Sequence, residues 1–210
     1  MNESQSKKLL ETELKSFVYS VSHDLKGELR ELKAILEKKG ATDPNIHFQF
    51  QIMEEMFESL GEMSSLLETE VKKETINLSL MATDIFQSLQ KRGAFNFKVQ
   101  DSLTVKGDTS LLKRALTALI ENSWKFSKNI ESPQIELGKE GDFFYIKDNG
   151  PGLPHEEEIF TMFYGKRSKG DLSGIGLGLP LARRVFHIHG GKIWAKNNKG
   201  KGSTFYFLIP

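Results

Sequence analysis

The sequence lacks cysteine and any long apolar run, and both absences narrow the class of protein. Without cysteine among its 210 residues, neither a disulfide nor a thiolate metal site is available, and a cytoplasmic location is expected. No apolar stretch approaches the ~18–20 residues that cross a bilayer. The polar segment 1–15 has no signal-peptide pattern, and the five histidines lack metal-ligand spacing. We therefore expect no membrane segment in this chain, although a larger parent protein could be membrane-anchored.

The net charge of +1 is unevenly divided along the chain. Residues 1–75 carry 10 basic and 15 acidic side chains, a net of −5, and the remainder carries 19 basic and 13 acidic, a net of +6. A basic C-terminal part suits a polyanion such as ATP, although solvated surface charge is the commoner cause of such a bias. No platform of basic and aromatic residues is recognisable in the sequence, so we expect no nucleic-acid partner.

Two apolar stripes in steps of three and four predict two long helices in the first seventy residues. One stripe runs from Leu10 to Leu36 and ends before Gly40, and the other runs from Ile46 to Leu67. The loop at 41–45 has strong turn chemistry. A helical hairpin cannot bury both stripes well by itself, so we expect residues 1–74 to form a homodimeric four-helix bundle. Packing of both helices on the C-terminal part is the alternative.

From about Thr75 the pattern changes to a mixture of helices and short strands. Asp108 is a plausible N-cap for one helix, and strands 96–100 and 103–106 are expected to be joined by a turn. The predicted helices are 78–91, 109–125 and 179–189, and the other predicted strands are 134–138, 143–147, 192–196 and 204–208. Residues 75–210 therefore form a predicted α+β domain, with a sheet covered on one face.

His23 is a candidate nucleophile on the first predicted helix. It lies two residues after Val21, about 200° around the helix from the apolar stripe, so its imidazole is expected to point outward. A nucleophilic imidazole needs an accessible nitrogen and a partner that orients or deprotonates the other nitrogen. The acidic Asp24 follows directly. A lone surface histidine usually has no such role, so the surrounding pattern must support it.

That pattern resembles the phosphoacceptor box of two-component sensor histidine kinases. Phe17 precedes His23 by six residues, and Ser22-His23-Asp24-Leu25-Lys26 matches the box in order. The resemblance implies that His23 accepts a phosphoryl group and that Asp24 is its general base. It also implies a dimeric four-helix bundle, and a response-regulator receiver domain that docks near His23 and takes the phosphoryl group on an aspartate.

Two positions depart from the family pattern. The family usually has a proline five residues after the histidine, where this chain has Glu28. The preceding Gly27 costs ~1 kcal/mol relative to alanine in a helix and could supply the missing flexibility. Many members have Thr or Asn four residues after the histidine, to position the water that dephosphorylates the regulator. Here that position is Gly27, which has no side chain, so a weak phosphatase is predicted.

Three glycine-containing motifs in the C-terminal part suggest a nucleotide site. Asp148-Asn149-Gly150-Pro151-Gly152-Leu153 follows a predicted strand, where the carboxylate of Asp148 can accept a hydrogen bond from the adenine amine. Gly174-Ile175-Gly176-Leu177-Gly178-Leu179 opens a helix, whose N-terminal amides attract phosphate. Gly200-Lys201-Gly202-Ser203-Thr204-Phe205 begins the last strand, and the Thr204 hydroxyl could hydrogen-bond near the base. Each motif alone is more often an ordinary turn.

A fourth motif lies on the predicted helix 109–125. Asn122 and Lys125 are three residues apart and share a face. The amide oxygen of Asn122 is a suitable ligand for Mg²⁺, and Lys125 can contact phosphate as a point charge. Glu121 could act as a base or through a water molecule. A solvated helix face is the ordinary explanation of such residues in isolation.

Together, in order and spacing, these motifs resemble the GHKL (Bergerat-type) ATP-binding fold that histidine kinases share with gyrase B and with the heat-shock and mismatch-repair ATPases. The resemblance implies an α+β sandwich that binds ATP and Mg²⁺, with Asn122 as the metal ligand. It assigns catalytic roles to His23, Asp24, Glu121 and Asn122. It assigns nucleotide contacts to Asn122, Lys125, Asp148, Gly150, Gly152, Gly174, Gly176, Gly178, Leu179 and Thr204.

Segment Ile159–Tyr164 resembles the phenylalanine box that anchors the lid over ATP. Lys166, Arg167 and Lys169 would then lie in the lid, and one of them could reach the γ-phosphate. The sequence as a whole predicts an ATP-dependent protein-histidine kinase core. Two alternatives stay open, a dimer-clamping ATPase of the same fold and a silent scaffold that binds a regulator. Phosphorylation within one chain or across a dimer is left undecided.

Overall fold

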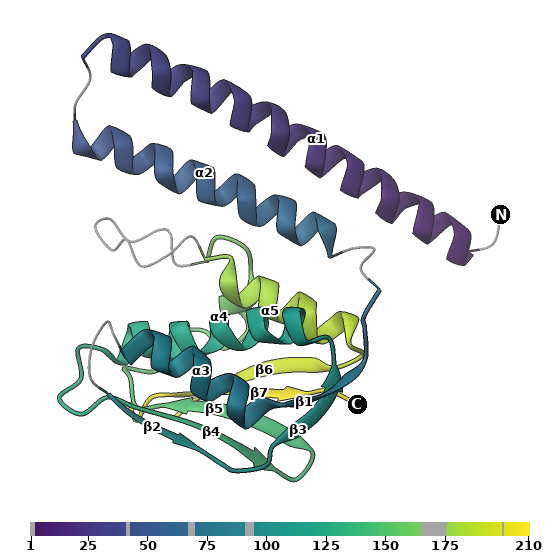
Figure 1. Ribbon diagram of the computed structural model, residues 1–210, viewed down its shortest axis with the longest axis vertical. Helices are drawn as coiled ribbons and strands as arrows, with labels where there is room; N and C mark the ends of the chain where they lie inside the picture. The colour runs from purple at the N-terminus through teal and green to yellow at the C-terminus, as the bar shows by residue number, and fades with distance from the viewer. Residues whose placement is uncertain (1–2, 41–42, 67–69, 91–94, 165–175, 199) are drawn as a thin grey trace. The chain divides into compact units, whose positions relative to one another are not determined.

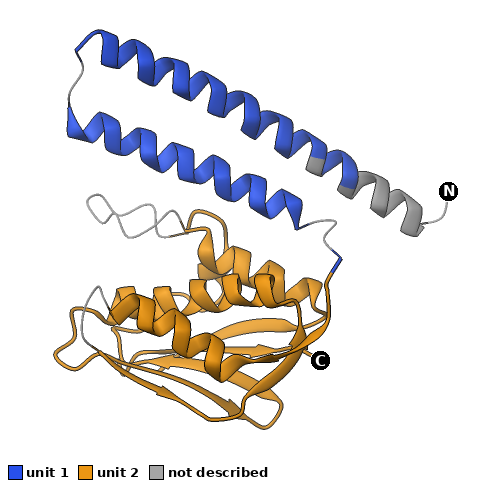
Figure 2. Cartoon of the chain, viewed as in Figure 1, with its two compact units in different colours: residues 1–70 blue, residues 71–210 orange. Residues whose placement is uncertain are grey.

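The computed structural model describes residues 3–40, 43–66, 70–90, 95–164, 176–198 and 200–210. The chain divides into two compact units, residues 1–70 and residues 71–210 (Figure 2). The helical unit therefore ends a few residues before the boundary expected near residue 75, and that boundary stays a prediction.

The first unit is a hairpin of two helices, α1 (Glu3–Lys38) and α2 (Pro44–Ser65) (Figure 1). After α1, Gly40 adopts the left-handed φ of 74° that commonly ends a helix. Asp43 caps α2 by accepting a hydrogen bond from the Asn45 amide at 2.8 Å, and Pro44 occupies the first turn. The two predicted helices are confirmed, whereas residues 41–42 of the predicted loop lie outside the described residues.

Apolar burial within this hairpin is incomplete. Leu29 on α1 is buried, with 7% of its surface exposed. The large apolar side chains of α1 that are 38–65% exposed are Leu14, Phe17, Tyr19, Val21, Leu25, Leu32 and Ile35. A single chain therefore leaves much of the α1 stripe in contact with water, which is unfavourable by about 25 cal/mol for each Å² of apolar surface that could be covered.

The second unit combines two sheets and a layer of helices. A five-stranded sheet has the order β2-β4-β5-β7-β6, and a two-stranded sheet pairs β1 with β3. Helices α3, α4 and α5 lie over one face of the larger sheet (Figure 1). The elements in chain order are β1 (Glu74–Asn77), α3 (Leu78–Gln90), β2 (Asn96–Val99), β3 (Thr104–Gly107), α4 (Thr109–Ser127), β4 (Gln134–Glu140), β5 (Phe143–Asp148), a 3₁₀ turn (Glu158–Phe160), α5 (Gly178–Ile188), β6 (Lys192–Asn197) and β7 (Ser203–Leu208).

The strands β2 and β3 are joined by the expected turn but belong to different sheets. Strands β2 and β3 do not pair with each other: β2 runs parallel to β4, and β3 runs antiparallel to β1. Ser102, with a left-handed φ of 59°, turns the chain out of the larger sheet. The amide of Leu103 then donates to the Ser79 hydroxyl at 3.0 Å, and the amide of Leu78 donates to the Leu103 carbonyl at 2.8 Å. Strand β1 was not predicted, because four residues with one buried side chain give too short a pattern.

The core lies between the larger sheet and the helices. On β5 and β7 every second side chain points inward, so Ile146, Phe205 and Phe207 are fully buried. Leu116 on α4 and Phe186 on α5 fill the space opposite them. Burial of each such side chain contributes roughly 1.5–3 kcal/mol. The alternate residues of β5, β7 and β6 face away from the helices.

Candidate nucleotide site and phosphoacceptor helix

Asp148 is the centre of the candidate nucleotide site. It is the last residue of β5 and only 4% of it is exposed. Its Oδ1 accepts hydrogen bonds from the amides of Gly150 at 2.9 Å and Ser203 at 3.2 Å, and its Oδ2 accepts from the Ser203 hydroxyl. These donors hold the carboxylate in one orientation. Oδ1 already accepts two hydrogen bonds, whereas Oδ2 accepts one and retains acceptor capacity for a ligand.

Thr204 does not lie where the sequence motif suggested. Side chains alternate along β7, so Thr204 faces away from the helices, in register with Lys147 and Lys196. Its hydroxyl accepts a hydrogen bond from the Asn198 side chain at 2.9 Å. The hydroxyl beside Asp148 belongs to Ser203, which sequence reasoning missed by one residue. Counting inward-facing positions back from the apolar Phe205 would have found it.

The glycines next to Asp148 are required by the close packing of the chain itself. A Cβ on Gly150 would lie 3.0 Å from Asp148 Oδ1, 3.2 Å from Ser127 Oγ and 3.3 Å from the Phe126 carbonyl oxygen. A Cβ on Gly202, whose φ is 91°, would collide with the backbone of Asp148. The first and last glycine motifs therefore meet each other and the C-terminal end of α4. Gly152 approaches Asn197 in the same way.

The described part of the second glycine motif lies at the start of α5. Gly176 has a φ of 76° and lies so close to the Tyr164 backbone that no Cβ would fit. Gly178 begins α5, and its Cβ position is 3.4 Å from the Cβ of Ala118 on α4. Ala118 is one helical turn before Asn122, so the two share a side of α4. Gly174 lies outside the described residues, whereas Leu179 is half-buried in the first turn of α5.

The polar motif of α4 presents an amide, a cation and an aromatic ring. Asn122 and Lys125 are half-buried, and Glu121 is exposed. The Lys125 ammonium is 4.9 Å from the ring centroid of Phe126, a side chain that is 45% exposed. The Phe126 carbonyl also borders Gly150. Phe126 was missed by sequence reasoning, although an exposed aromatic ring beside a candidate adenine site is a natural surface for stacking a base.

The segment that resembles the phenylalanine box is partly buried. Ile159 and Phe160 are 6% and 7% exposed, and the Phe160 ring meets the Phe205 ring edge-on at 6.5 Å. Phe163 adopts a left-handed φ of 63°, and its amide donates to the Gly176 carbonyl at 3.0 Å. This segment is thereby attached to both the core and the second glycine motif. Lys166, Arg167 and Lys169 lie outside the described residues.

His23 is exposed on α1, as its helical position predicted. Its side chain is 74% exposed, and Nδ1 lies 3.2 Å from Oδ1 of Asp24. A carboxylate at Nδ1 favours the tautomer with the proton on Nδ1 and the lone pair on Nε2. The Tyr19 ring is stacked near the imidazole, with centroids 6.4 Å apart and an interplanar angle of 24°. The imidazole is thus accessible and oriented from two sides.

One turn beyond His23, a salt bridge joins the two helices of the hairpin. The Lys26 ammonium donates to Glu58 Oε1 at 2.8 Å. The Lys26 contact, reinforced by Arg30, lowers the pKa of Glu58 below its ordinary value. At Gly27, the residue after Lys26, no atom other than those of its chain neighbours and of the backbone of its own helix lies within 4 Å of the Cβ position. A side chain placed at Gly27 would therefore be accommodated without displacing a neighbour.

Asn122 fits the limited ligand requirement of Mg²⁺ at a nucleotide. Within the described residues there is no group of three or more His, Asp or Glu side chains placed to hold a metal ion. Mg²⁺ at a nucleotide usually takes one or two protein oxygens, the phosphates and several waters, so one amide oxygen is sufficient.

None of the described helices is both long enough and apolar enough to span a membrane.

Comparison with known sequences identifies similar proteins over nearly the whole chain. Residues 107–210 match the family described as histidine kinase-, DNA gyrase B-, and HSP90-like ATPase. The methanogenesis regulatory histidine kinase FilI of Methanothrix harundinacea is 29% identical over 94% of this chain and 25% of its own length. The adaptive-response sensory kinase SasA of Prochlorococcus marinus is 29% identical over 90% of this chain and 55% of its own length. The chain thus spans about a quarter to about half of these relatives.

Solved structures give the same picture of the fold. The histidine kinase ThkA, in complex with the response regulator protein TrrA, superposes with a TM-score of 0.67 at 20% identity, covering 99% of this chain and 66% of that one. The nucleotide-free catalytic domain of ThkA superposes with a TM-score of 0.53 at 26% identity, covering 68% of this chain and 98% of that one.

Proposed function

We infer from the membership of residues 107–210 in the histidine kinase-, DNA gyrase B-, and HSP90-like ATPase family that this chain is the catalytic core of a two-component histidine kinase. The resemblance to sensor histidine kinases is confirmed by relatives that match both units. One observation supports the kinase over other ATPases of the fold. The same chain carries an exposed imidazole with a carboxylate at Nδ1, on a helix outside the ATPase unit.

ATP is the proposed phosphoryl donor, held by residues 71–210. Asp148 would accept a hydrogen bond from the adenine amine, and Phe126 would cover the base. Lys125 would contact phosphate. Mg²⁺, bound by the Asn122 amide oxygen and the phosphates, would neutralise charge on the nucleotide. The roles of Glu121, Gly174, Gly176, Gly178 and Leu179 stay as expected from the sequence.

His23 is the proposed phosphoryl acceptor. The Nε2 lone pair attacks the γ-phosphorus, the bond from that phosphorus to the bridging oxygen breaks, and ADP leaves with the electron pair. Asp24 stabilises the positive charge that develops on the imidazole, and accepts the Nδ1 proton as general base. His23 Nδ1 and Asp24 Oδ1 are 3.2 Å apart and exposed, so this pair contributes little to stability. Its proposed role is to orient the imidazole.

A second copy of the hairpin and a response regulator are the proposed partners. The exposed apolar side chains of α1 would be covered in a homodimeric four-helix bundle formed by residues 1–74. An aspartate of the regulator's receiver domain would then take the phosphoryl group from His23, and the cytoplasm is the proposed location. Transfer within one chain and transfer across the dimer are both compatible with these residues.

The direct test uses γ-labelled ATP with Mg²⁺ on wild type, His23→Gln and Asn122→Ala. We expect acid-labile, alkali-stable label on wild type and none on either variant. His23→Gln should still bind ATP, which separates loss of the acceptor from loss of the nucleotide site. ATP turnover without label would favour a dimer-clamping ATPase, and ATP binding without turnover or label would favour a scaffold.

Weak phosphatase activity is part of the proposal, because Gly27 offers no side chain to position water. Since the space around its Cβ position is open, Gly27→Thr should fold normally and raise dephosphorylation of the regulator. Gly27→Ala is the matched control, since it adds helix propensity without a hydroxyl. Equal regulator dephosphorylation by wild type and Gly27→Thr would contradict this assignment.

A further inference from the structure

The outer face of the five-stranded sheet, which points away from α3, α4 and α5, carries a row of aromatic side chains. Tyr145, Tyr206 and Trp194 stand in register on β5, β7 and β6. The Trp194 and Tyr206 rings are stacked at 5.5 Å with an angle of 11°, and Phe143 meets Trp194 edge-on at 5.0 Å. These rings are partly exposed, and they form one apolar strip across three strands.

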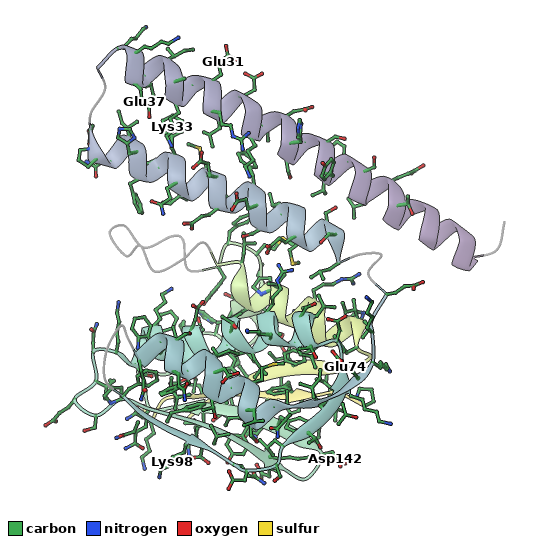
Figure 3. The ribbon with its side chains drawn as sticks, viewed as in Figure 1. Glu31, Lys33, Glu37, Glu74, Lys98 and Asp142 are labelled. Carbon is green, nitrogen blue, oxygen red and sulfur yellow. The ribbon has the colours of Figure 1, made fainter. Side chains whose placement is uncertain are left out.

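A row of lysines runs beside this strip. Lys98, Lys147 and Lys196 lie in one cross-strand row, on the first, third and fifth strands of the sheet, with Glu136 and Thr204 between them. Neighbouring strands are about 4.8 Å apart, so successive lysines are about 10 Å apart. Figure 3 shows Lys98 on the side of the sheet opposite the helices.

Two of the lysines of this face lie over its aromatic rings. Lys192 lies 5.6 and 5.2 Å from the ring centroids of Phe143 and Trp194, and Lys196 lies 5.9 Å from that of Tyr206. Within the described residues, no ion pair joins Lys98, Lys147, Lys192 or Lys196 to a carboxylate.

The acidic residue in the lysine row is already engaged by another group. Glu136 accepts a hydrogen bond at 2.6 Å from the Tyr145 hydroxyl, and this bond raises the pKa of Tyr145 to about 12. The hydroxyl therefore keeps its proton at neutral pH and continues to occupy Glu136. The face presents four cations on an aromatic floor, against the two carboxylates of Glu136 and Glu140.

An acidic helix fits this face better than a nucleic acid or a lipid surface. Bases stack on free ring faces, whereas here lysine ammonium groups lie over the rings of Trp194 and Tyr206. Lipid insertion needs apolar groups that project, whereas these rings pack against one another. Residues seven apart on a helix are about 10.5 Å apart, which matches the lysine spacing. Neighbouring apolar positions of such a helix would contact the aromatic strip.

We propose that this outer face docks a partner helix with carboxylates at seven-residue intervals beside apolar residues. The assignment is independent of the phosphoryl-transfer chemistry, because none of these side chains belongs to the nucleotide site or to α1. It also explains why three strands carry exposed aromatic residues where a purely solvated face would carry polar ones.

Binding of a fluorescein-labelled helical peptide, with glutamate at every seventh position and leucine beside it, tests this by anisotropy with the full chain. We expect saturable binding that Lys147→Glu combined with Lys196→Glu weakens by at least about tenfold. Lys106→Glu on β3, exposed in the other sheet, should leave it unchanged. Circular dichroism and ATP binding verify that the double variant folds, and Lys147→Gln with Lys196→Gln should give a smaller loss.

Three further ligands distinguish an acidic helix from other binding partners of this face. A peptide of the same composition with its glutamates shuffled should bind at least about tenfold more weakly. Single-stranded oligothymidylate and phosphatidylserine vesicles should bind more weakly still. Equal binding of the shuffled peptide, tighter binding of oligothymidylate or vesicles, or no effect of the charge-reversal variant would overturn the proposal.

Discussion

Apolar side chains have different surroundings in the two units. On α1, Leu14, Phe17 and Leu32 are 49–65% exposed, whereas Phe205 and Phe207 on β7 are fully buried. The second unit closes its core between a sheet and three helices, as an independent domain does. The first unit is a hairpin of two helices, too few to enclose a core. The difference indicates that the second unit closes a core by its own packing, and it supports the proposal that the hairpin pairs with a second copy.

Removing a core ring should produce the largest effect. Phe207 stacks on Phe144 at 5.3 Å and on Phe186 at 4.7 Å. Phe207→Ala should therefore lower the free energy of unfolding of the second unit by about 3–5 kcal/mol in urea titrations. Leu80→Ala, at a position 64% exposed on α3, is the control and should change it by less than about 0.5 kcal/mol. Similar losses for both would show that the second unit has no closed core.

A charged side chain placed among the exposed apolar residues of α1 should weaken dimerisation and leave the second unit intact. Leu32→Glu should weaken dimerisation by about a hundredfold or more, because each of two copies loses roughly 1.5–3 kcal/mol of burial. Sedimentation velocity measures this, with Leu80→Glu as the exposed control in the other unit. ATP binding should be unchanged in both variants. A wild-type chain that stays monomeric at high concentration would contradict the proposal that a second copy covers the exposed apolar side chains of α1.

The assignment of Ser203 in place of Thr204 predicts a smaller difference inside the nucleotide site. Ser203→Ala removes a hydrogen bond that orients Asp148, which should cost ~1 kcal/mol, or about fivefold in ATP affinity. Thr204→Ala, on the opposite face of β7, should leave the affinity unchanged. Calorimetric titration distinguishes the two, and a larger loss for Thr204→Ala would restore the original assignment.

The cap of α4 gives the second unit a modest acid sensitivity. The Ser110 hydroxyl, and the amides of Leu111 and Ser110, donate to Asp108 and hold its pKa below the ordinary value. A depressed folded-state pKa means that this stabilisation is complete above about pH 4 and is lost as pH falls through the folded-state value. Asp108→Ala should cost ~1 kcal/mol at neutral pH and reduce the acid dependence in urea titrations. An unchanged acid dependence would contradict this role.

Removal of the salt bridge between the two helices of the hairpin should have the smallest effect on stability. Lys26 and Glu58 are both partly exposed, so Lys26→Ala should lower stability by less than about 1 kcal/mol. Thermal unfolding at low and high salt measures the loss, which should vanish at high salt because screening removes the attraction. A large, salt-independent loss would assign the bridge a structural role.

Most of the elements were predictable, because their periodicities are local. The stripe from Leu10 to Leu36, the Asp108 cap and the alternation of 143–147 each require only a short window of sequence. The sheet to which each of the strands β2 and β3 belongs could not be predicted, because the parallel pairing of β2 with β4 depends on residues almost forty positions away. Strand β1 was missed for lack of length.

The motifs of the candidate nucleotide site were predictable, but the direction in which each side chain points was not. Asp148 and the glycine runs are visible in sequence, whereas the choice between Ser203 and Thr204 depends on which side of β7 faces the helices. The basic and aromatic face was invisible for a related reason. Its members Lys98, Tyr145 and Trp194 come from three strands far apart in the chain, and the sheet brings them onto one surface.

The decisive measurement for the proposed kinase activity is to locate the phosphoryl group on the chain. After incubation of the wild-type chain with ATP and Mg²⁺, digestion and mass spectrometry at alkaline pH should place one phosphoryl group on the peptide that contains His23. Incubation of that species with a cognate receiver domain should then empty the peptide. Phosphate on a serine or on another histidine, with His23 unmodified, would contradict the account.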